Sequence, residues 1–210
     1  MFNAIKLLRI PFSIFLMPIF WFSLVNTGNI SSSIAIHIFI ILHLFVYPAS
    51  NGYNSYFDRD DGSIGGLKKP PKVDNKLFKL VVFWDFLSIL YSLLISLDFA
   101  ILMLIYTLIS KAYSYDKIRL KKHPVLSTLI VTIFQGSFIY FSIQWALTYS
   151  IEFIIDPFNL IMGITSTLFL IGSYPLTQIY QHEEDYERDD ITISIKLGKI
   201  GTLVFSSIIF

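Results

Sequence analysis

Long apolar runs alternate with short polar connections along this chain. Six runs, at residues 10–26, 33–53, 77–97, 99–115, 124–149 and 158–180, approach or exceed the roughly 20 helical residues that cross a bilayer. A further apolar run begins at Gly201 and reaches Phe210, the last residue of the sequence. The pattern predicts an all-α integral membrane protein, a bundle of six transmembrane helices plus the start of a seventh, in one domain over residues 1–210.

The composition supports this class. Hydrophobic residues make up 54% of the chain, charged residues only 15%, and the mean hydropathy is +0.64; soluble domains carry about 25% charged residues. With no cysteine, the chain has no disulfides, thiolate metal sites or cysteine nucleophile. The net charge of +1 gives no reason to expect a nucleic-acid partner, and no obligate protein partner is evident. The expected environment is the lipid bilayer.

The basic residues predict how the helices are oriented. All 16 Lys and Arg residues fall before or near the start of the first run, or around the connections after the second, fourth and sixth runs. The opposite connections, at residues 27–32, around Asp98 and at 150–157, hold none. Because short cytoplasmic loops collect Lys and Arg, the amino terminus is predicted to be cytoplasmic, in the inner or plasma membrane if the protein is bacterial.

Two acid-rich stretches, residues 51–61 and 178–190, follow the second and sixth runs and share this predicted cytoplasmic side. If helix continues to Gly62, four side chains of the first stretch share one helical face at i, i+3, i+7 and i+10. Nearly the same interval recurs in the second stretch. The two sets are Asn51, Asn54, Asp58 and Asp61, and Gln178, Gln181, Asp185 and Asp189. Such oxygen atoms suit Mg²⁺; the alternative is that both stretches are solvated helix ends.

Basic side chains lie on the same predicted side of the membrane. They include Lys68, Lys69, Lys117, Arg119, Lys121 and Lys122. Individually each could simply determine topology, but together they could bind phosphate oxygens that a metal ion leaves uncovered. Acids, bases and aromatic residues at one end of an apolar bundle indicate a site for a metal-bound diphosphate with an apolar tail.

Three segments carry a resemblance to a known family. Asn54–Asp61 resembles the Asn-Asp-Tyr-x-Asp-Arg signature of the UbiA superfamily of intramembrane prenyltransferases. Gln181–Asp185, followed by Thr192 and Lys196-Leu-Gly198, resembles its second aspartate-rich signature. Tyr113-Ser-Tyr115 with Arg119-Leu-Lys-Lys122 resembles the element after the fourth helix. The three occur in the family's order and on one side of the membrane, so their combination is specific.

The resemblance implies a fold and a reaction. Helices would surround a lipid-accessible cavity, and both acidic motifs would coordinate Mg²⁺ on an isoprenyl diphosphate donor. The metal and the basic residues would neutralise the leaving diphosphate while a lipophilic acceptor, an aromatic compound or quinone precursor, captures the allylic cation. Tyr53, Tyr56, Tyr115 and Tyr174 are candidates for stabilising that cation through their ring faces.

Residue spacing and the resemblance together assign candidate roles. The expected catalytic residues are Asp58, Asp61, Asp185 and Tyr115. The expected diphosphate-binding residues are Asn51, Asn54, Arg59, Lys68, Lys69, Lys117, Arg119, Lys121, Gln178 and Gln181. The expected metal ligands are Asn54, Asp58, Asp61, Gln181, Glu184, Asp185 and Asp189.

The chain departs from the family pattern at several points. Gly62 stands where the first motif ends in Asp, so Asp61 is expected to take that place. Gln181 stands where Asp is common, so either Glu184 compensates or the metal is held more loosely on that side. The family has about nine helices, and a sequence that ends at Phe210 is expected to be a fragment of that fold.

Other functions stay open at this stage. A non-catalytic remnant of the family would share the departures, and a cation or proton transporter would also carry membrane carboxylates, although usually near the bilayer midplane. Asp85, inside the third run, either faces the cavity or handles a proton or the acceptor. Gln135 and Gln144 in the fifth run are expected to form hydrogen bonds between helices.

Overall fold

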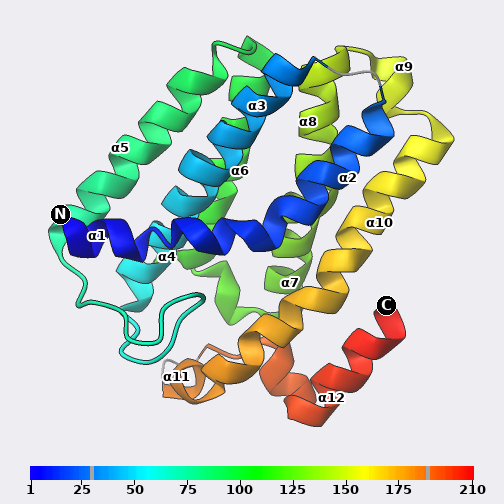
Figure 1. Ribbon diagram of the computed structural model, residues 1–210. Coiled ribbons are helices and arrows are strands. Elements are labelled where there is room, and N and C mark those ends of the chain that lie inside the picture. The colour runs from blue at the N-terminus through cyan, green and yellow to red at the C-terminus, as the bar shows by residue number, and fades with distance from the viewer. Residues whose placement is uncertain (29–30, 188–189) are drawn as a thin grey trace.

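The computed structural model describes residues 1–28, 31–187 and 190–210, without the side chains of Glu184 and Glu187 (Figure 1). The described residues form helices and connections, with a single isolated bridge between Ile64 and Leu67. The first half contains α1 (Phe2–Leu7), η1 (Ile10–Leu16), α2 (Met17–Thr27), α3 (Ser32–Ile40), η2 (Ile41–Val46), α4 (Tyr47–Asp58), α5 (Asn75–Ser92) and α6 (Leu97–Ser114). The second half contains η3 (Leu120–Lys122), α7 (Pro124–Ile133), η4 (Phe134–Phe138), α8 (Ile139–Thr148), α9 (Ile151–Ile154), α10 (Pro157–Ser173), η5 (Tyr174–Gln181), α11 (His182–Glu187) and α12 (Ile193–Ile209).

The prediction of an all-helical membrane protein is confirmed at this level. In the described part of the chain, five helical stretches are long and apolar enough to cross a membrane: Phe2–Thr27, Ser32–Asp58, Leu97–Ser114, Pro124–Thr148 and Pro157–Gln181. The third predicted run forms α5, which carries Lys76, Lys79 and Asp85 and is not among these five. Charged side chains are costly inside a bilayer, so α5 differs in character from its neighbours.

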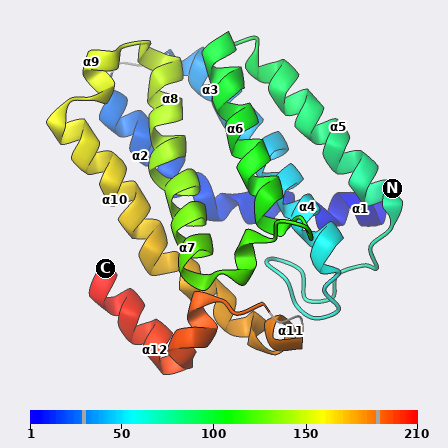
Figure 2. The same cartoon turned by 180° about the vertical axis from the view of Figure 1, so that it is seen from behind.

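The long helices run side by side, and their connections gather at two ends (Figures 1 and 2). α4 packs against α5 and α6, α2 packs against α8, and α10 packs against η4. α11, α12 and the long connection between α4 and α5 lie at the same end of the bundle. Both acidic stretches, which end α4 and begin at η5, therefore meet at this end.

Two membrane helices contain a π-helical segment partway along their length. A π-helical segment, η2, joins α3 to α4, and another, η4, joins α7 to α8. At Gly136 in η4 the backbone is non-helical, and a Cβ there would lie 2.8 Å from the Cα of Thr167 in α10. The Ser137 N–H donates a hydrogen bond to Thr167 Oγ1 over 3.1 Å. Gly136 thus permits the close approach of α10 to η4.

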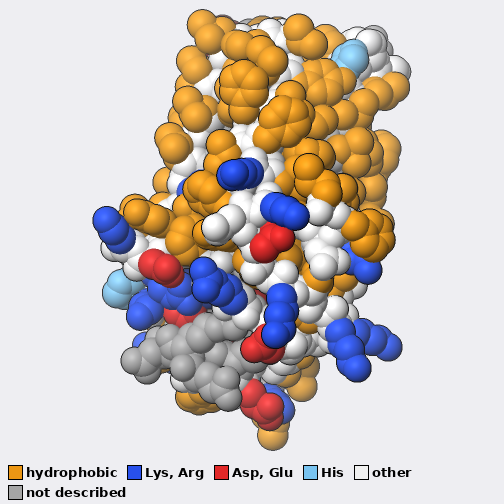
Figure 3. Space-filling model, turned by 90° about the vertical axis from the view of Figure 1, so that its left-hand side faces the viewer, with side chains coloured by type: hydrophobic (Ala, Val, Ile, Leu, Met, Phe, Trp, Pro, Cys, Tyr) orange, Lys and Arg blue, Asp and Glu red, His pale blue; other side chains and the backbone are white. Residues whose placement is uncertain are grey.

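The outer surface separates apolar from charged side chains. Figure 3 shows hydrophobic side chains over the upper part of one face, with Lys, Arg, Asp and Glu gathered below them. Large exposed apolar residues include Phe86, Leu94, Ile161 and Val204. Contiguous apolar surface of this kind marks contact with lipid rather than water. The polar end of the bundle is the part expected to reach the aqueous side.

Candidate functional site

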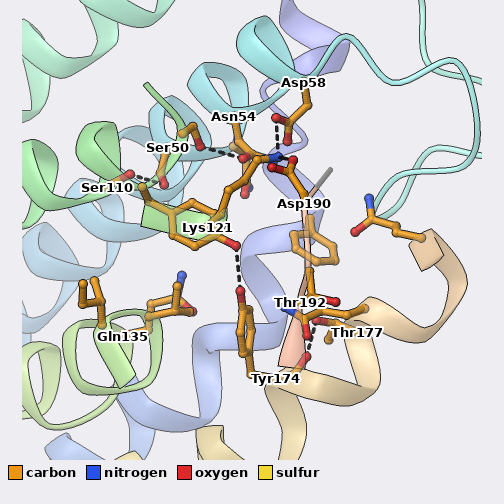
Figure 4. Close-up of a pocket in the computed structure, with 18 of the residues that line it drawn as sticks. Ser50, Asn54, Asp58, Ser110, Lys121, Gln135, Tyr174, Thr177, Asp190 and Thr192 are labelled. Atoms are coloured by element: carbon orange, nitrogen blue, oxygen red, sulfur yellow. Dashed lines mark hydrogen bonds and ion pairs between the residues drawn. The ribbon is translucent and has the colours of Figure 1, made fainter. Parts of the chain in front are cut away.

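A cavity opens at the polar end of the bundle, and residues from both halves of the chain line it (Figure 4). Its volume of about 180 Å³ is several times the ~30 Å³ that one water molecule occupies. The polar lining comprises Arg9, Ser50, Asn51, Asn54, Asp58, Asp60, Ser110, Tyr113, Ser114, Lys121, Gln135, Tyr174, Thr177, Gln178, Tyr180, Gln181, Asp185, Asp190 and Thr192. Apolar lining comes from Phe12, Ile109, Ile130, Val131 and Phe134, with the Tyr106 ring. The cavity therefore joins a charged mouth to an apolar wall.

The first acidic stretch is only partly helical. α4 places Asn51, Asn54 and Asp58 on the cavity lining at the predicted spacing. The helix then ends, because Arg59 adopts the left-handed conformation (φ 51°, ψ 43°). The expectation that the helix continues to Gly62 is therefore wrong. Asp60 lines the cavity, whereas Asp61 is exposed and lies outside the lining.

The second acidic stretch approaches the cavity from the other side. After Pro175 the chain continues as the 3₁₀ helix η5, which carries Gln178 and Gln181 to the lining, and Asp185 follows from α11. Asp190 also lines the cavity, and its side chain is fully buried. The Glu184 side chain and Asp189, two predicted metal ligands, lie outside the described residues. Asp190 was missed from the sequence because helical spacing favours its neighbour.

Lys121 and Arg119 join the two acidic stretches. Lys121 Nζ lies 2.5 Å from Asp58 Oδ1 and 2.9 Å from Asp190 Oδ2. Arg119 donates from Nε to Asp190 Oδ1 over 3.0 Å and from Nη2 to Asp190 Oδ2 over 2.8 Å. Its Nη2 is also 3.6 Å from Asp58 Oδ1, and its Nη1 is 2.8 Å from Asp116. Two predicted diphosphate-binding cations thus neutralise carboxylates from both walls.

Asp185 and Asp190, two acids of the second stretch that line the cavity, have different pKa values. Burial raises the pKa of the Asp190 carboxyl, but the hydrogen bonds and charges of Arg119 and Lys121 outweigh burial and hold it below its usual range. Burial raises the pKa of Asp185 to about 7; the attraction of Lys121 opposes this shift, and the negative charges of Asp190 and Asp58 add to it. Asp185 therefore changes its protonation near neutral pH, whereas Asp190 stays ionised.

Hydrogen bonds between neutral side chains hold the helices around the cavity. Ser114 Oγ donates to Asn54 Oδ1 over 2.6 Å, which ties α6 to α4. The hydroxyls of Tyr113 and Tyr174 lie 2.7 Å apart and tie α6 to η5 (Figure 4). These bonds orient an amide oxygen and two phenols at the cavity, and no local sequence pattern indicates either pair of partners.

Arg9 is a site residue that the sequence analysis treated only as a topology determinant. It adopts a left-handed conformation (φ 49°) between α1 and η1 and is 8% exposed. Its Nη2 donates to the Asn51 carbonyl oxygen over 3.3 Å and lies 3.5 Å from Asn51 Oδ1. A cation from the first helical stretch therefore lines the cavity beside α4.

Several predicted residues lie away from the cavity lining. Arg59 lies over the Tyr56 ring, with its guanidinium carbon 6.0 Å from the ring centroid. Tyr115 packs edge-on against Phe57, with ring centroids 5.6 Å apart. The exposed Lys68, Lys69 and Lys117 also lie outside the lining. Of the four tyrosines proposed from the sequence, Tyr174 lines the cavity and Tyr53, Tyr56 and Tyr115 do not.

Asp85 pairs with a neighbouring helix rather than facing the cavity. Its Oδ1 lies 3.0 Å from Lys111 Nζ in α6, and Lys111 Nζ lies 4.7 Å from the centroid of the Tyr53 ring. Asp85 and Lys111 both lie outside the cavity lining. The expectation that Asp85 faces the cavity is wrong, and the pair ties α5 to α6.

The cavity offers oxygen donors of the kind that Mg²⁺ binds. Asn54, Asp58 and Asp60 lie on one wall, and Gln181, Asp185 and Asp190 lie on the other. Among the described residues, no three acidic or histidine side chains form a ready-made metal cluster. Magnesium commonly takes one or two carboxylates and completes its shell with phosphate oxygens and water, so these donors fit a metal bound together with a diphosphate.

Comparisons with known proteins identify relatives of the whole fold. The sequence model of the UbiA prenyltransferase family matches residues 15–210. A UbiA homologue from Archaeoglobus fulgidus, solved with DMAPP and Mg²⁺, is 18% identical with a TM-score of 0.75, over 99% of this chain and 73% of that one. The Cd²⁺-bound structure of a UbiA homologue from the same organism gives 17% identity and a TM-score of 0.72, over 99% and 73%.

A third similar structure is described as digeranylgeranylglyceryl phosphate synthase. It is 20% identical, with a TM-score of 0.64, over 99% of this chain and 72% of that one. No curated protein sequence matches this chain significantly. At these identities the solved structures support the fold, while the family match covers most of the sequence.

Proposed function

We propose that this chain, which belongs to the UbiA prenyltransferase family, transfers an isoprenyl group from an isoprenyl diphosphate to a lipophilic acceptor inside the membrane. The observation that carries the proposal is the meeting of both acidic stretches with Lys121 and Arg119 at one cavity. The apolar wall of the same cavity suits a prenyl chain. We also propose that residues 1–210 form one domain, with the amino terminus and both acidic stretches on the cytoplasmic side.

The diphosphate end of the donor would bind at the charged mouth. Lys121, Arg119 and Arg9 supply positive charge there, although Arg119 reaches the mouth from just outside the cavity lining. The amides of Asn51, Asn54, Gln178 and Gln181 could donate hydrogen bonds to phosphate oxygens. Lys68, Lys69 and Lys117 stay candidates for attracting the donor from solution rather than for contacting it.

Mg²⁺ would be held by Asn54, Asp58 and Asp60 on one wall and by Gln181, Asp185 and Asp190 on the other. Asp60 takes the place proposed for Asp61, because Asp60 lines the cavity. Glu184 and Asp189 remain in the proposed set on their sequence pattern alone. The bound ion would supply Lewis-acid neutralisation of the diphosphate as its charge develops.

Transfer would begin when the bond from the allylic carbon to the diphosphate oxygen breaks and its electron pair leaves with the diphosphate. Lys121 and Arg119 would stabilise that developing charge. The ring faces of Tyr113 and Tyr174 could stabilise the allylic cation, and Ile109, Val131 and Phe134 would exclude water from it. An electron-rich acceptor carbon or oxygen then forms the new bond and releases a proton. We propose an aromatic compound or quinone precursor as the acceptor.

A transfer assay tests this proposal directly. The protein, purified in nanodiscs, would be given Mg²⁺, radiolabelled isoprenyl diphosphates of several chain lengths, and a panel of aromatic, quinone-ring and glycerol phosphate acceptors. We expect labelled product with at least one acceptor, and loss of product with EDTA or with Asp58→Asn. Absence of transfer across the panel would favour the non-catalytic alternative, and Lys72→Met serves as the matched control because Lys72 is exposed and lies outside the cavity lining.

A further inference from the structure

Lys121 stands between the two acidic walls of the cavity. Its Nζ lies 2.5 Å from Asp58 Oδ1 and 2.9 Å from Asp190 Oδ2, and its side chain is 7% exposed. Figure 4 shows the ammonium nitrogen between these two carboxylates. Lys121 contacts one oxygen of each of two carboxylates that we propose as ligands of a divalent ion. One resident cation therefore competes for the proposed metal ligands.

The two carboxylates depend on Lys121 to different degrees. Asp190 receives both Nε and Nη2 of Arg119, at 3.0 Å and 2.8 Å, in addition to Lys121. Asp58 has Lys121 at 2.5 Å, while the nearest Arg119 nitrogen lies 3.6 Å away. A two-bonded guanidinium is a rigid partner, whereas a lysine ammonium is a point charge on a flexible chain. Movement of Lys121 would thus leave Asp190 with both Arg119 hydrogen bonds and leave Asp58 with only the longer 3.6 Å contact to Arg119.

We propose that Lys121 is an exchangeable counter-ion of Asp58, which opposes binding of a divalent cation alone and releases Asp58 when a diphosphate offers its ammonium other oxygens. This inference rests on the proposed function for its ligand, a metal-bound diphosphate. It goes further by assigning an order: metal and diphosphate bind together, rather than the metal first.

The charge of Lys121 should have opposite effects on the binding of the metal ion and of the diphosphate. A dication at Asp58 must displace the Lys121 ammonium or tolerate its repulsion, and at this depth a unit charge a few ångströms away can change affinity by about ten-fold or more. A diphosphate is attracted by the same ammonium. Removing the charge of Lys121 should therefore strengthen binding of metal alone and weaken binding of the diphosphate. A lysine that only helps to hold the metal diphosphate would not strengthen metal binding when it is removed.

Manganese binding measures the first effect without any donor or acceptor. Free Mn²⁺ would be followed by electron paramagnetic resonance as it is titrated into purified wild type, Lys121→Met and Lys72→Met. We expect Lys121→Met to bind Mn²⁺ about ten-fold more tightly than wild type. Lys72→Met removes an exposed lysine outside the cavity lining, and its Mn²⁺ affinity should stay within about two-fold of wild type. When inorganic pyrophosphate is added, its dissociation constant from Lys121→Met should be about ten-fold higher than from wild type.

Two further variants test the effect of the Lys121 charge. They also keep the inference testable if Lys121→Met does not fold. Lys121→Gln keeps a hydrogen-bond donor and loses the charge, so it should also gain Mn²⁺ affinity. Lys121→Arg keeps the charge and should bind Mn²⁺ as wild type does. This inference is overturned if wild type binds Mn²⁺ together with pyrophosphate but folded Lys121→Gln or Lys121→Met binds Mn²⁺ no more tightly than wild type. That outcome leaves the proposed function standing. Wild type that binds no Mn²⁺ even with pyrophosphate overturns both.

Discussion

Among the buried polar groups of the described residues, two clusters differ in charge and in access. At the cavity, Asp58, Asp190, Arg119 and Lys121 form an ionic cluster beside open space. Between α8 and α10, Gln144, Asn159 and Tyr140 form an uncharged cluster, with Tyr140 and Gln144 fully buried and Asn159 4% exposed. The first cluster offers charges beside a space that can take a ligand, whereas the second exchanges hydrogen bonds only within the protein.

The uncharged cluster is satisfied internally. Asn159 Oδ1 accepts from Tyr140 Oη over 2.8 Å and from Gln144 Nε2 over 2.9 Å. Asn159 Nδ2 donates to Gln144 Oε1 over 2.8 Å and to the Phe153 carbonyl oxygen over 3.0 Å. Fully paired neutral networks specify how helices pack, and the expected interhelical role of Gln144 is confirmed. Buried ion pairs contribute less reliably to stability, so the ionic cluster indicates function rather than packing.

The largest expected effect is on chemistry at the ionic cluster. Asp58→Asn should lower the rate of prenyl transfer by about 100-fold or more, since the proposed site loses a metal ligand and the close partner of Lys121. The transfer assay measures this rate, and the midpoint of thermal unfolding in detergent should change little. A rate within ten-fold of wild type would contradict the role proposed for Asp58.

The matching change at the uncharged cluster should affect stability instead. Asn159→Leu leaves the Gln144 amide, the Tyr140 hydroxyl and the Phe153 carbonyl without this partner, and each unpaired buried group costs ~1–3 kcal/mol. We expect the free energy of unfolding to fall by about 3 kcal/mol, while the folded fraction keeps its transfer rate. Thr165→Val is the control on α10, because exposed Thr165 bonds only to the Ile161 carbonyl oxygen of its own helix. Equal losses in both variants would refute the network's structural role.

A pH titration can distinguish Asp185 from the two acids of the ionic cluster. Because the pKa of Asp185 is raised to about 7, its carboxyl becomes protonated as the pH falls through that value and then competes poorly for metal. Mn²⁺ affinity in the presence of pyrophosphate should be roughly eight-fold weaker at pH 6 than at pH 7.5, as expected for one such group. Asp185→Asn should remove this dependence, and Asp61→Asn should retain it. A pH profile that Asp185→Asn leaves unaltered would disprove the assignment.

The smallest expected effect concerns the hydrogen bond between the hydroxyls of Tyr113 and Tyr174 at the cavity. Tyr113→Phe removes the 2.7 Å bond to the Tyr174 hydroxyl and should raise the KM for the isoprenyl diphosphate about three- to ten-fold, as for one hydrogen bond. Steady-state kinetics would show the change, and Tyr186→Phe is the control because Tyr186 is exposed. A KM equal to that of wild type would remove Tyr113 from the proposed site.

Sequence reasoning located much of the fold and one wall of the site. Apolar runs predict membrane helices because spanning length and apolarity are properties of consecutive residues. The spacing of Asn51, Asn54 and Asp58 predicted their common face, since all three lie within α4. The same rule failed at Asp61, where the left-handed turn at Arg59 ends the helix and turns Asp60 to the cavity instead. Periodicity holds only as far as the helix does.

By itself, then, the sequence determined the membrane class, the family signatures and the acidic stretches, because each is encoded within a continuous segment. Only the tertiary structure decided which charges meet. Arg9 reaches Asn51, and Lys121 and Arg119 bridge Asp58 to Asp190, across separations that no local pattern records. Helix packing also brings Tyr113 rather than Tyr115 to the cavity. Contacts between distant segments depend on how whole helices pack, and that packing makes two acid-rich helix ends into one cation-bridged site.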